Sequence, residues 1–91
     1  MSGTRTEAVQ RMSAKVLMSN YRRAPVAFAR GEGIRLYDLE GRVYLDFVAG
    51  IAVSVLGHSH PRLVAAIQAQ AERLIHVSNL YLIPEQARLA Q

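Results

Sequence analysis

The sequence predicts a mixed α/β chain in which a three-stranded antiparallel meander lies between helices. Two observations predict this fold class. Apolar and polar side chains alternate with a period of two over residues 34–37 and 43–47, which is typical of strands with one buried face. Apolar residues recur every three or four positions near the N-terminus and after Pro61, which indicates amphipathic helices. We therefore expect an N-terminal helix, the meander, a helix over residues 61–75 and the start of a further helix.

The N-terminal helix is predicted over residues 6–18, where apolar side chains share one face. Pro25 excludes a continuation, because the residue before a proline is pushed out of the α region. A first strand is expected over residues 26–29. Gly31 and Gly33 are then expected to form a turn into the second strand.

The second and third strands are predicted to form a hairpin around residues 38–41, where Gly41 can adopt the positive φ that such a connection requires. After Phe47 the alternation ends, and small residues dominate positions 49–52. Backbone in this small-residue loop can approach a ligand closely. Asp38 and Asp46, in the hairpin strands, are expected to be solvent-exposed or to form an ion pair.

The helix after the meander is predicted to begin at Pro61, which suits a first helical turn. Gln70 falls inside its apolar stripe, so either that part of the stripe is only half covered or the helix packs against a polar group. A non-periodic connector follows at residues 76–81. Pro84 opens a further helix whose pattern is cut off at Gln91, and we expect the chain to be part of a longer protein.

Composition argues against several classes of protein. The 91 residues carry a net charge of +4, but all except one of the 11 basic residues are arginines spread along the chain. A nucleic-acid surface normally clusters its cations and interleaves aromatic residues, so no nucleic-acid partner is expected. The sequence has no cysteine, no signal peptide and no apolar run long enough for a membrane span. We expect a soluble protein of the cytoplasm with no membrane partner.

His58 and His60, two residues apart, are the only pair that suggests a metal site. A third ligand is missing, since His76 is separated from them by a helix. We therefore predict a tight turn into the proline-started helix, and no metal ligand.

Four motifs in order over residues 17–91 carry a family resemblance: NYRRAP, RGEGIRLYDLEGRVYLDFVAGIAV, LGHSHPRLVAAIQAQ and LIHVSNLYLIPEQARLA. This series resembles the N-terminal segment of class III aminotransferases, which are pyridoxal-phosphate enzymes of fold type I. Within that class it is most similar to the enzymes that use N-acetylornithine. The ornithine, succinylornithine and 4-aminobutyrate aminotransferases share the scaffold and remain alternatives.

The resemblance implies an exchange in which the cofactor, bound to a lysine, takes an amino group from N-acetylornithine and gives it to 2-oxoglutarate, within arginine biosynthesis. It also implies a homodimer. Residues 1–19 would form a helical arm, residues 20–60 part of the small domain, and residues 61–91 the path to a large domain.

The resemblance assigns no catalytic or cofactor-binding residue to this chain. The family's phosphate-binding turn, aspartate and lysine all follow the matching region, and Lys15, the single lysine, precedes it. We expect the 91-residue chain to be inactive alone.

Four residues correspond to positions near the active site in the family. Tyr21 matches a position that reaches the substrate, although packing beside Pro25 would equally explain an aromatic residue there. Ile51 matches a position beside the distal end of the donor, or is simply core. Asn79 and Leu80 match a connector that borders the active site, often across the dimer interface.

A function of another class is also open at this point. The amphipathic helices would suit a stand-alone, non-enzymatic module that docks on a partner.

Overall fold

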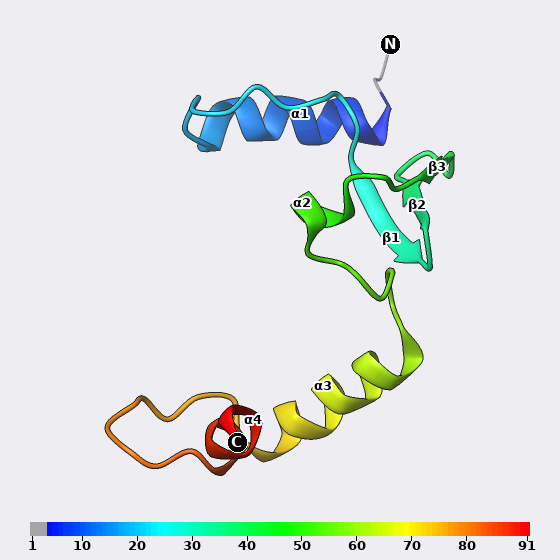
Figure 1. The fold of residues 1–91 in the computed structure, drawn as a ribbon. Coiled ribbons are helices and arrows are strands. Elements are labelled where there is room, and N and C mark those ends of the chain that lie inside the picture. The colour runs from blue at the N-terminus through cyan, green and yellow to red at the C-terminus, as the bar shows by residue number, and fades with distance from the viewer. Residues whose placement is uncertain (1–3) are drawn as a thin grey trace. The chain divides into compact units, whose positions relative to one another are not determined.

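A computed structural model describes residues 4–91 of the chain (Figure 1). The chain divides into two compact units, Met1–His60 and Pro61–Gln91, and each is described by itself. The elements follow in the order α1 (Arg5–Val16), β1 (Phe28–Glu32), β2 (Arg35–Asp38), β3 (Val43–Leu45), α2 (Ala49–Ala52), α3 (Pro61–Arg73) and α4 (Pro84–Ala90).

Helix α1 begins with a capping box. The Thr4 hydroxyl accepts the backbone N–H of Glu7 at 3.1 Å, and the Glu7 carboxylate accepts the backbone N–H of Thr4 at 3.1 Å. These two bonds satisfy N–H groups that a helix start leaves without partners. The helix ends at Val16, two residues before the predicted end, because Leu17 is already extended.

Glu40, in the β2–β3 turn, attaches α1 to the sheet. Its carboxylate accepts the backbone N–H of Thr6 at 3.1 Å and the Thr6 hydroxyl, and Thr6 is buried. Arg5 adds a bond from its guanidinium to the carbonyl of Leu39 at 3.2 Å. A carboxylate suits the first turn of a helix because the helix dipole is positive there.

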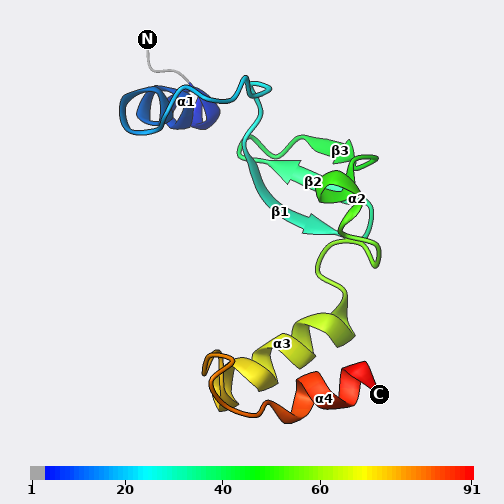
Figure 2. The ribbon, with the colours of Figure 1, turned by 60° about the vertical axis from the view of Figure 1, so that its left-hand side comes forward.

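The three strands form an antiparallel sheet in the order β1-β2-β3, as predicted (Figure 2). The predicted first strand over residues 26–29 was placed too early, because β1 extends to Glu32. Gly31 therefore lies within the strand, opposite Leu36, and only Gly33, with φ 59°, belongs to the turn. Gly31 is required by close approach, because a Cβ atom there would lie 2.7 Å from the Cβ of His58.

The third strand is shorter than predicted. β3 ends at Leu45, and Phe47 lies beyond it with its side chain exposed. The Asp46 carboxylate ends the strand because it accepts the backbone N–H groups of Val48 and Ala49, which turns the chain out of the sheet.

In the second unit, α3 begins at Pro61 as predicted but ends at Arg73, two residues early. Gln70 bonds to this end of the helix. Its half-buried side-chain amide donates to the carbonyl of Leu74 at 3.0 Å, so it caps the helix end and needs no polar partner from another element. Helix α4 begins at Pro84, as the sequence predicts.

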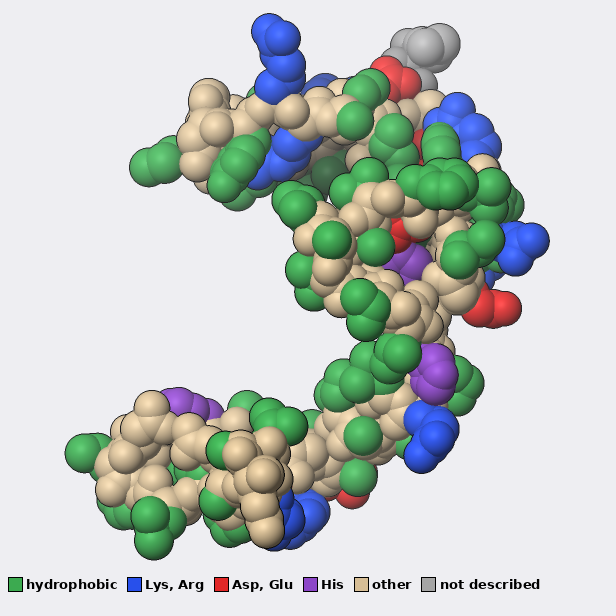
Figure 3. Space-filling view, in the orientation of Figure 1, with side chains coloured by type: hydrophobic (Ala, Val, Ile, Leu, Met, Phe, Trp, Pro, Cys, Tyr) green, Lys and Arg blue, Asp and Glu red, His purple; other side chains and the backbone are tan. Residues whose placement is uncertain are grey.

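Apolar side chains are spread over the surface of both units (Figure 3). Among residues 4–91, no hydrophobic side chain is buried, and the only buried residues are Thr6 and Asp38. Hydrogen-bonded turns therefore fix the first unit more than a hydrophobic core does. No helix within the described part of the chain is long and apolar enough to cross a membrane.

Candidate functional site

The buried carboxylate of Asp38 hydrogen-bonds to both sides of the β2–β3 hairpin. Its Oδ1 accepts the backbone N–H groups of Glu40 at 3.0 Å and Arg42 at 2.8 Å. Its Oδ2 accepts the Arg42 guanidinium at 2.9 Å and the Tyr44 hydroxyl at 3.0 Å. The carboxylate thus holds both ends of the turn at once, and the ion-pair alternative predicted for Asp38 is confirmed while the solvent-exposed one is wrong.

The pKa of Asp38 reflects two opposing effects. Burial, the largest single effect, raises the pKa. The backbone N–H of Arg42, the Tyr44 hydroxyl and the Arg42 guanidinium together lower it by more, so the pKa of Asp38 lies below its ordinary value of 3.8. The same contact raises the pKa of Tyr44 above its ordinary 10.0, chiefly because its hydroxyl donates to Asp38. All four of these hydrogen bonds lie within the hairpin, so Asp38 serves its fold.

Asp46 likewise holds two parts of the chain together, at the start and at the end of the loop that follows β3. Its Oδ1 accepts the backbone N–H groups of Val48 at 3.0 Å and Ala49 at 2.9 Å. Its Oδ2 lies 2.6 Å from Nε2 of His58, at the far end of the loop. The solvent-exposed alternative is wrong for Asp46 as well, and its partner is the His58 ring, which is a cation only when it is protonated.

The ionisation of Asp46 follows from its surroundings. The backbone N–H of Ala49, the His58 ring and the backbone N–H of Val48 hold the pKa of Asp46 below its ordinary 3.8, against the effect of burial. Asp46 is therefore an ionised acceptor at neutral pH, and Nε2 of His58 carries the proton that it donates. The Nε2 atom of His58 is therefore occupied by its hydrogen bond to Asp46.

The backbone of His58 is fixed as well. Its N–H donates to the carbonyl of Gly33 at 2.8 Å, and its carbonyl accepts the N–H of Gly33 at 2.9 Å. Figure 1 shows the chain returning from α2 to the turn between β1 and β2, where this bridge lies. Ser59 follows with its hydroxyl donating to the carbonyl of Gly31 at 2.8 Å. The segment 46–58, which we call the Asp46 loop, is thus held by side chain and backbone where it ends.

Inside the Asp46 loop, α2 is a single left-handed turn. Ala49, Gly50, Ile51 and Ala52 all have positive φ, between 53° and 64°. Three of the four are not glycine, and each L-residue in this conformation costs roughly 1–2 kcal/mol. A β-branched residue such as Ile51 is an outlier there. The turn closes by backbone bonds from Ala52 to Val48 at 2.8 Å and from Val53 to Ala49 at 2.7 Å.

The left-handed turn displays Ile51 rather than burying it. The residue has φ 64° and ψ 60°, and its side chain is 84% exposed. Strained backbone that presents an exposed side chain is typical of functional sites, because packing alone would not require the strain. Within this chain Ile51 is not packed in a core, and its place beside the donor or in a core of the complete protein stays a prediction.

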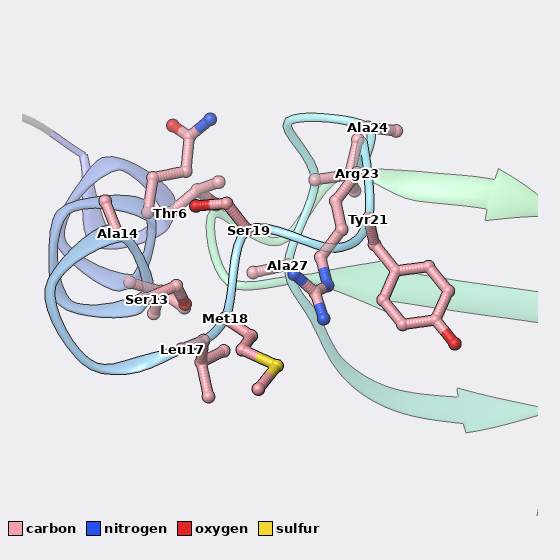
Figure 4. Close-up of a pocket in the computed structure, with 13 residues that line it drawn as sticks. Thr6, Ser13, Ala14, Leu17, Met18, Ser19, Tyr21, Arg23, Ala24 and Ala27 are labelled. Carbon is pink, nitrogen blue, oxygen red and sulfur yellow. The ribbon is translucent and has the colours of Figure 1, made fainter.

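Tyr21 lies in the segment that runs back along α1 after the helix ends. It lines a cavity of about 300 Å³ between α1 and residues 17–27, together with Val9, Leu17, Met18, Arg23 and Val26 (Figure 4). The Arg23 guanidinium lies 5.3 Å from the centre of the Tyr21 ring, which favours a cation–π contact. The phenol points away from α1 and is 72% exposed.

Asn79 and Leu80 lie in the second unit, in a turn organised by Ser78. Ser78 has φ 74°, its hydroxyl accepts the N–H of Leu80 at 3.2 Å, and its carbonyl accepts the N–H of Tyr81 at 3.3 Å. Leu80 is 86% exposed, and Asn79 is exposed as well. Tyr21 and Ile51 thus belong to one unit, and Asn79 and Leu80 to the other.

The residues that sequence analysis missed are those that build the Asp46 loop. Asp46 was expected only as a strand-end carboxylate, and His58 only as part of a turn. Within residues 4–91, no three His, Cys, Asp or Glu side chains are grouped so that they could hold a metal ion. The contact of His58 with Asp46, 12 residues earlier, has no signal in local sequence.

Comparison with known proteins identifies the family. Residues 16–91 match the model of the class III aminotransferases. The chain belongs to this family. The predicted resemblance is confirmed, and α1 lies almost wholly before the matched residues.

Individual relatives refine the picture. An acetylornithine aminotransferase of Synechocystis sp. is 59% identical over 75 residues, which is 82% of this chain and 18% of that protein. The crystal structure of acetylornithine aminotransferase from Elizabethkingia anophelis superposes with a TM-score of 0.87 at 32% identity, over 91% of this chain and 21% of its own. The predicted fold class is confirmed by this similarity.

A structure of taurine:2-oxoglutarate aminotransferase from Bifidobacterium kashiwanohense, in complex with PLP and glutamate, matches with a TM-score of 0.80 at 26% identity. It covers 99% of this chain and 21% of that one. The chain therefore spans about a fifth of the length of the relatives that it matches.

Proposed function

We propose that this chain is the N-terminal portion of a pyridoxal-phosphate-dependent aminotransferase that moves an amino group from N-acetylornithine, or a similar ω-amino donor, to 2-oxoglutarate. The reaction serves arginine biosynthesis, and the complete enzyme is a cytoplasmic homodimer. The observation that carries the proposal is the 59% identity, over 75 residues, to a protein named acetylornithine aminotransferase. Membership of the class III family favours this function over a stand-alone interaction module.

Residues 1–19 form the arm of this enzyme, residues 20–60 part of its small domain, and residues 61–91 the path to its large domain. In this arrangement the exposed apolar side chains of both units are covered by the rest of the enzyme. The 91-residue chain alone is inactive, because it holds only part of the active site.

The residues of this chain do not make a cofactor site. Lys15, the single lysine, is exposed in the last turn of α1 and precedes the residues that match the family. Pyridoxal phosphate would therefore be held by residues of the complete enzyme that follow this chain.

Substrate binding is the part of the function that these residues can serve. Ile51 offers an exposed apolar surface on a rigid turn, which accepts the acyl end of N-acetylornithine but gives no partner to the charged amine of ornithine. Tyr21 offers a phenol, a hydrogen-bond donor for a substrate carboxylate. Asn79 and Leu80 border the site or the dimer interface.

The test uses the full-length enzyme with both donors at one 2-oxoglutarate concentration. Ile51→Tyr places a phenol that can bond the free amine, so the preference for N-acetylornithine over ornithine in kcat/KM should fall by roughly tenfold to two-hundredfold. Cofactor content, read from its absorbance, should stay unchanged. Equal losses for both donors, or loss of cofactor, would contradict a role of Ile51 in donor binding.

Val55→Tyr is the matched control, since Val55 is 83% exposed in the same loop but is not in the left-handed turn. It should leave the donor preference within about twofold of wild type, well below the effect of one pocket contact. A wild-type enzyme that transaminates neither donor would refute the proposed substrate class.

A further inference from the structure

We infer that Asp46 and His58 are positioning residues for the amino donor: their contact clamps the Asp46 loop so that its left-handed turn presents Ile51 at the donor site. The inference rests on the proposed function for its substrate, and on the geometry of the loop for its mechanism. Neither residue is itself assigned contact with the donor.

The first step is that the left-handed turn needs an external hold. Ala49, Ile51 and Ala52 have no intrinsic preference for positive φ, so the isolated segment would relax to other conformations. A strained conformation persists only where its surroundings determine it. Within this chain Ile51 does not supply that hold by packing, because most of its side chain is exposed.

The second step is that Asp46 supplies the hold at the start of the turn. Its Oδ1 accepts the N–H groups of Val48, which precedes the positive-φ run, and of Ala49, which begins it. The same Val48 and Ala49 provide the carbonyls that close the turn, to the N–H groups of Ala52 and Val53. The peptide unit that carries the Ala49 N–H also carries the Val48 carbonyl, so Asp46 holds the acceptor of the first of these two bonds directly.

The third step is that His58 fixes Asp46. The Asp46 side chain is only 9% exposed, and its second oxygen is bound by Nε2 of His58 at 2.6 Å. The backbone of His58 is held in turn, because its N–H and its carbonyl are both hydrogen-bonded to Gly33. The sheet thus determines His58, His58 determines the orientation of Asp46, and Asp46 determines the turn that carries Ile51.

The experiment uses the full-length enzyme and compares Asp46→Ala with Asp46→Asn. Alanine removes the acceptor of both N–H groups and the partner of His58. Asparagine keeps an oxygen for the two N–H groups and can donate to Nε2 of the other His58 tautomer. Asp46→Ala should raise amide hydrogen exchange of Ala52 and Val53 about tenfold or more, as expected for local opening. The preference for N-acetylornithine over ornithine should fall by roughly tenfold, the low end of the effect of one pocket contact.

Asp46→Asn should return the amide exchange and the donor preference to within about threefold of wild type, because asparagine keeps the hydrogen bonds. If the negative charge were what mattered, Asp46→Asn would behave like Asp46→Ala. Should Asp46→Ala fail to fold, His58→Ala removes one of the three bonds and gives the same comparison. Glu85→Ala is the control, because Glu85 makes only an exposed ion pair at 3.8 Å, with Arg88 on α4. It should change neither quantity.

Each outcome decides the inference. Unchanged exchange in Asp46→Ala would overturn the clamp, and raised exchange with unchanged donor preference would overturn its role in positioning. If the wild type does not use N-acetylornithine, the proposed function fails. The exchange comparison then still confirms or overturns the clamp, since it depends on no substrate.

Discussion

Asp38 and Asp46 each hold a place where the chain of the first unit reverses direction. The two turns differ in how many of their residues have positive φ. Asp38 has four partners inside the β2–β3 hairpin, where only Gly41 has positive φ. Asp46 has three partners around a turn in which four successive residues have positive φ. Each carboxylate is ionised and largely withdrawn from water.

The difference lies in the backbone strain that each carboxylate holds in place. The Asp38 hairpin uses glycine at its one demanding position, so its backbone carries little strain. The Asp46 loop places alanine and isoleucine in a conformation that glycine would adopt at lower cost. Presenting the Ile51 side chain is the consequence that distinguishes the second arrangement.

The largest effect that would separate the two regions is expected from Gly31→Ala. The new methyl group would meet the Cβ and Cγ atoms of His58 at 2.7 Å, next to the backbone that bridges to Gly33. Overpacking of this kind costs about 1–3 kcal/mol of stability. Chemical unfolding of the full-length enzyme measures the loss, and exchange at Ala52 and Val53 should rise because His58 is displaced.

Gly41→Ala is the matched control in the hairpin. A Cβ atom there meets nothing within 4 Å, so only the φ of 85° opposes the substitution, at a cost of roughly 1–2 kcal/mol. It should destabilise the hairpin and leave exchange at Ala52 and Val53 unchanged. If both variants loosen both regions equally, the two carboxylates do not act on separate turns.

Sequence analysis predicted those features that depend on local residues. Helical periodicity gave α1 and α3, the alternation around Gly41 gave the second hairpin, and Pro84 gave the start of α4. These elements depend on side chains within one turn or one strand of each other. Their ends were less accurate, because contacts such as the Gln70 cap and the Asp46 bonds decide them.

The remaining features depend on residues that are distant in sequence. Glu40 reaches Thr6 across 34 residues, and His58 reaches Asp46 across 12. Gly31 was taken for a turn residue because close approach of His58 leaves no mark in its neighbours. The left-handed turn was expected only as a small-residue loop, since alanine and isoleucine do not favour positive φ. The contacts that build the Asp46 loop were thus predicted less well than the helices and strands around it.

A smaller effect is expected from pH, and it tests whether the two carboxylates are independent. Both have pKa values lowered below 3.8 in the folded chain, so their contribution to stability is complete above that pH and is lost as pH falls through the folded values. Tyr44 has the opposite sign. Its pKa is raised above 10.0, so its contribution is complete below pH 10 and is lost as pH rises through the folded value.

Tyr44→Phe removes one hydrogen bond from Asp38 and none from Asp46. The carboxyl titration of Asp38, followed by carbon-13 NMR and assigned with Asp38→Asn and Asp46→Asn, should move upward toward 3.8. The titration of Asp46 should stay where it is, because its lowering comes from Ala49, His58 and Val48. A shift of both midpoints together would mean that the hairpin and the Asp46 loop respond as one electrostatic unit. An unmoved Asp38 midpoint would mean that the backbone N–H and the guanidinium of Arg42 hold that carboxylate ionised without help from Tyr44.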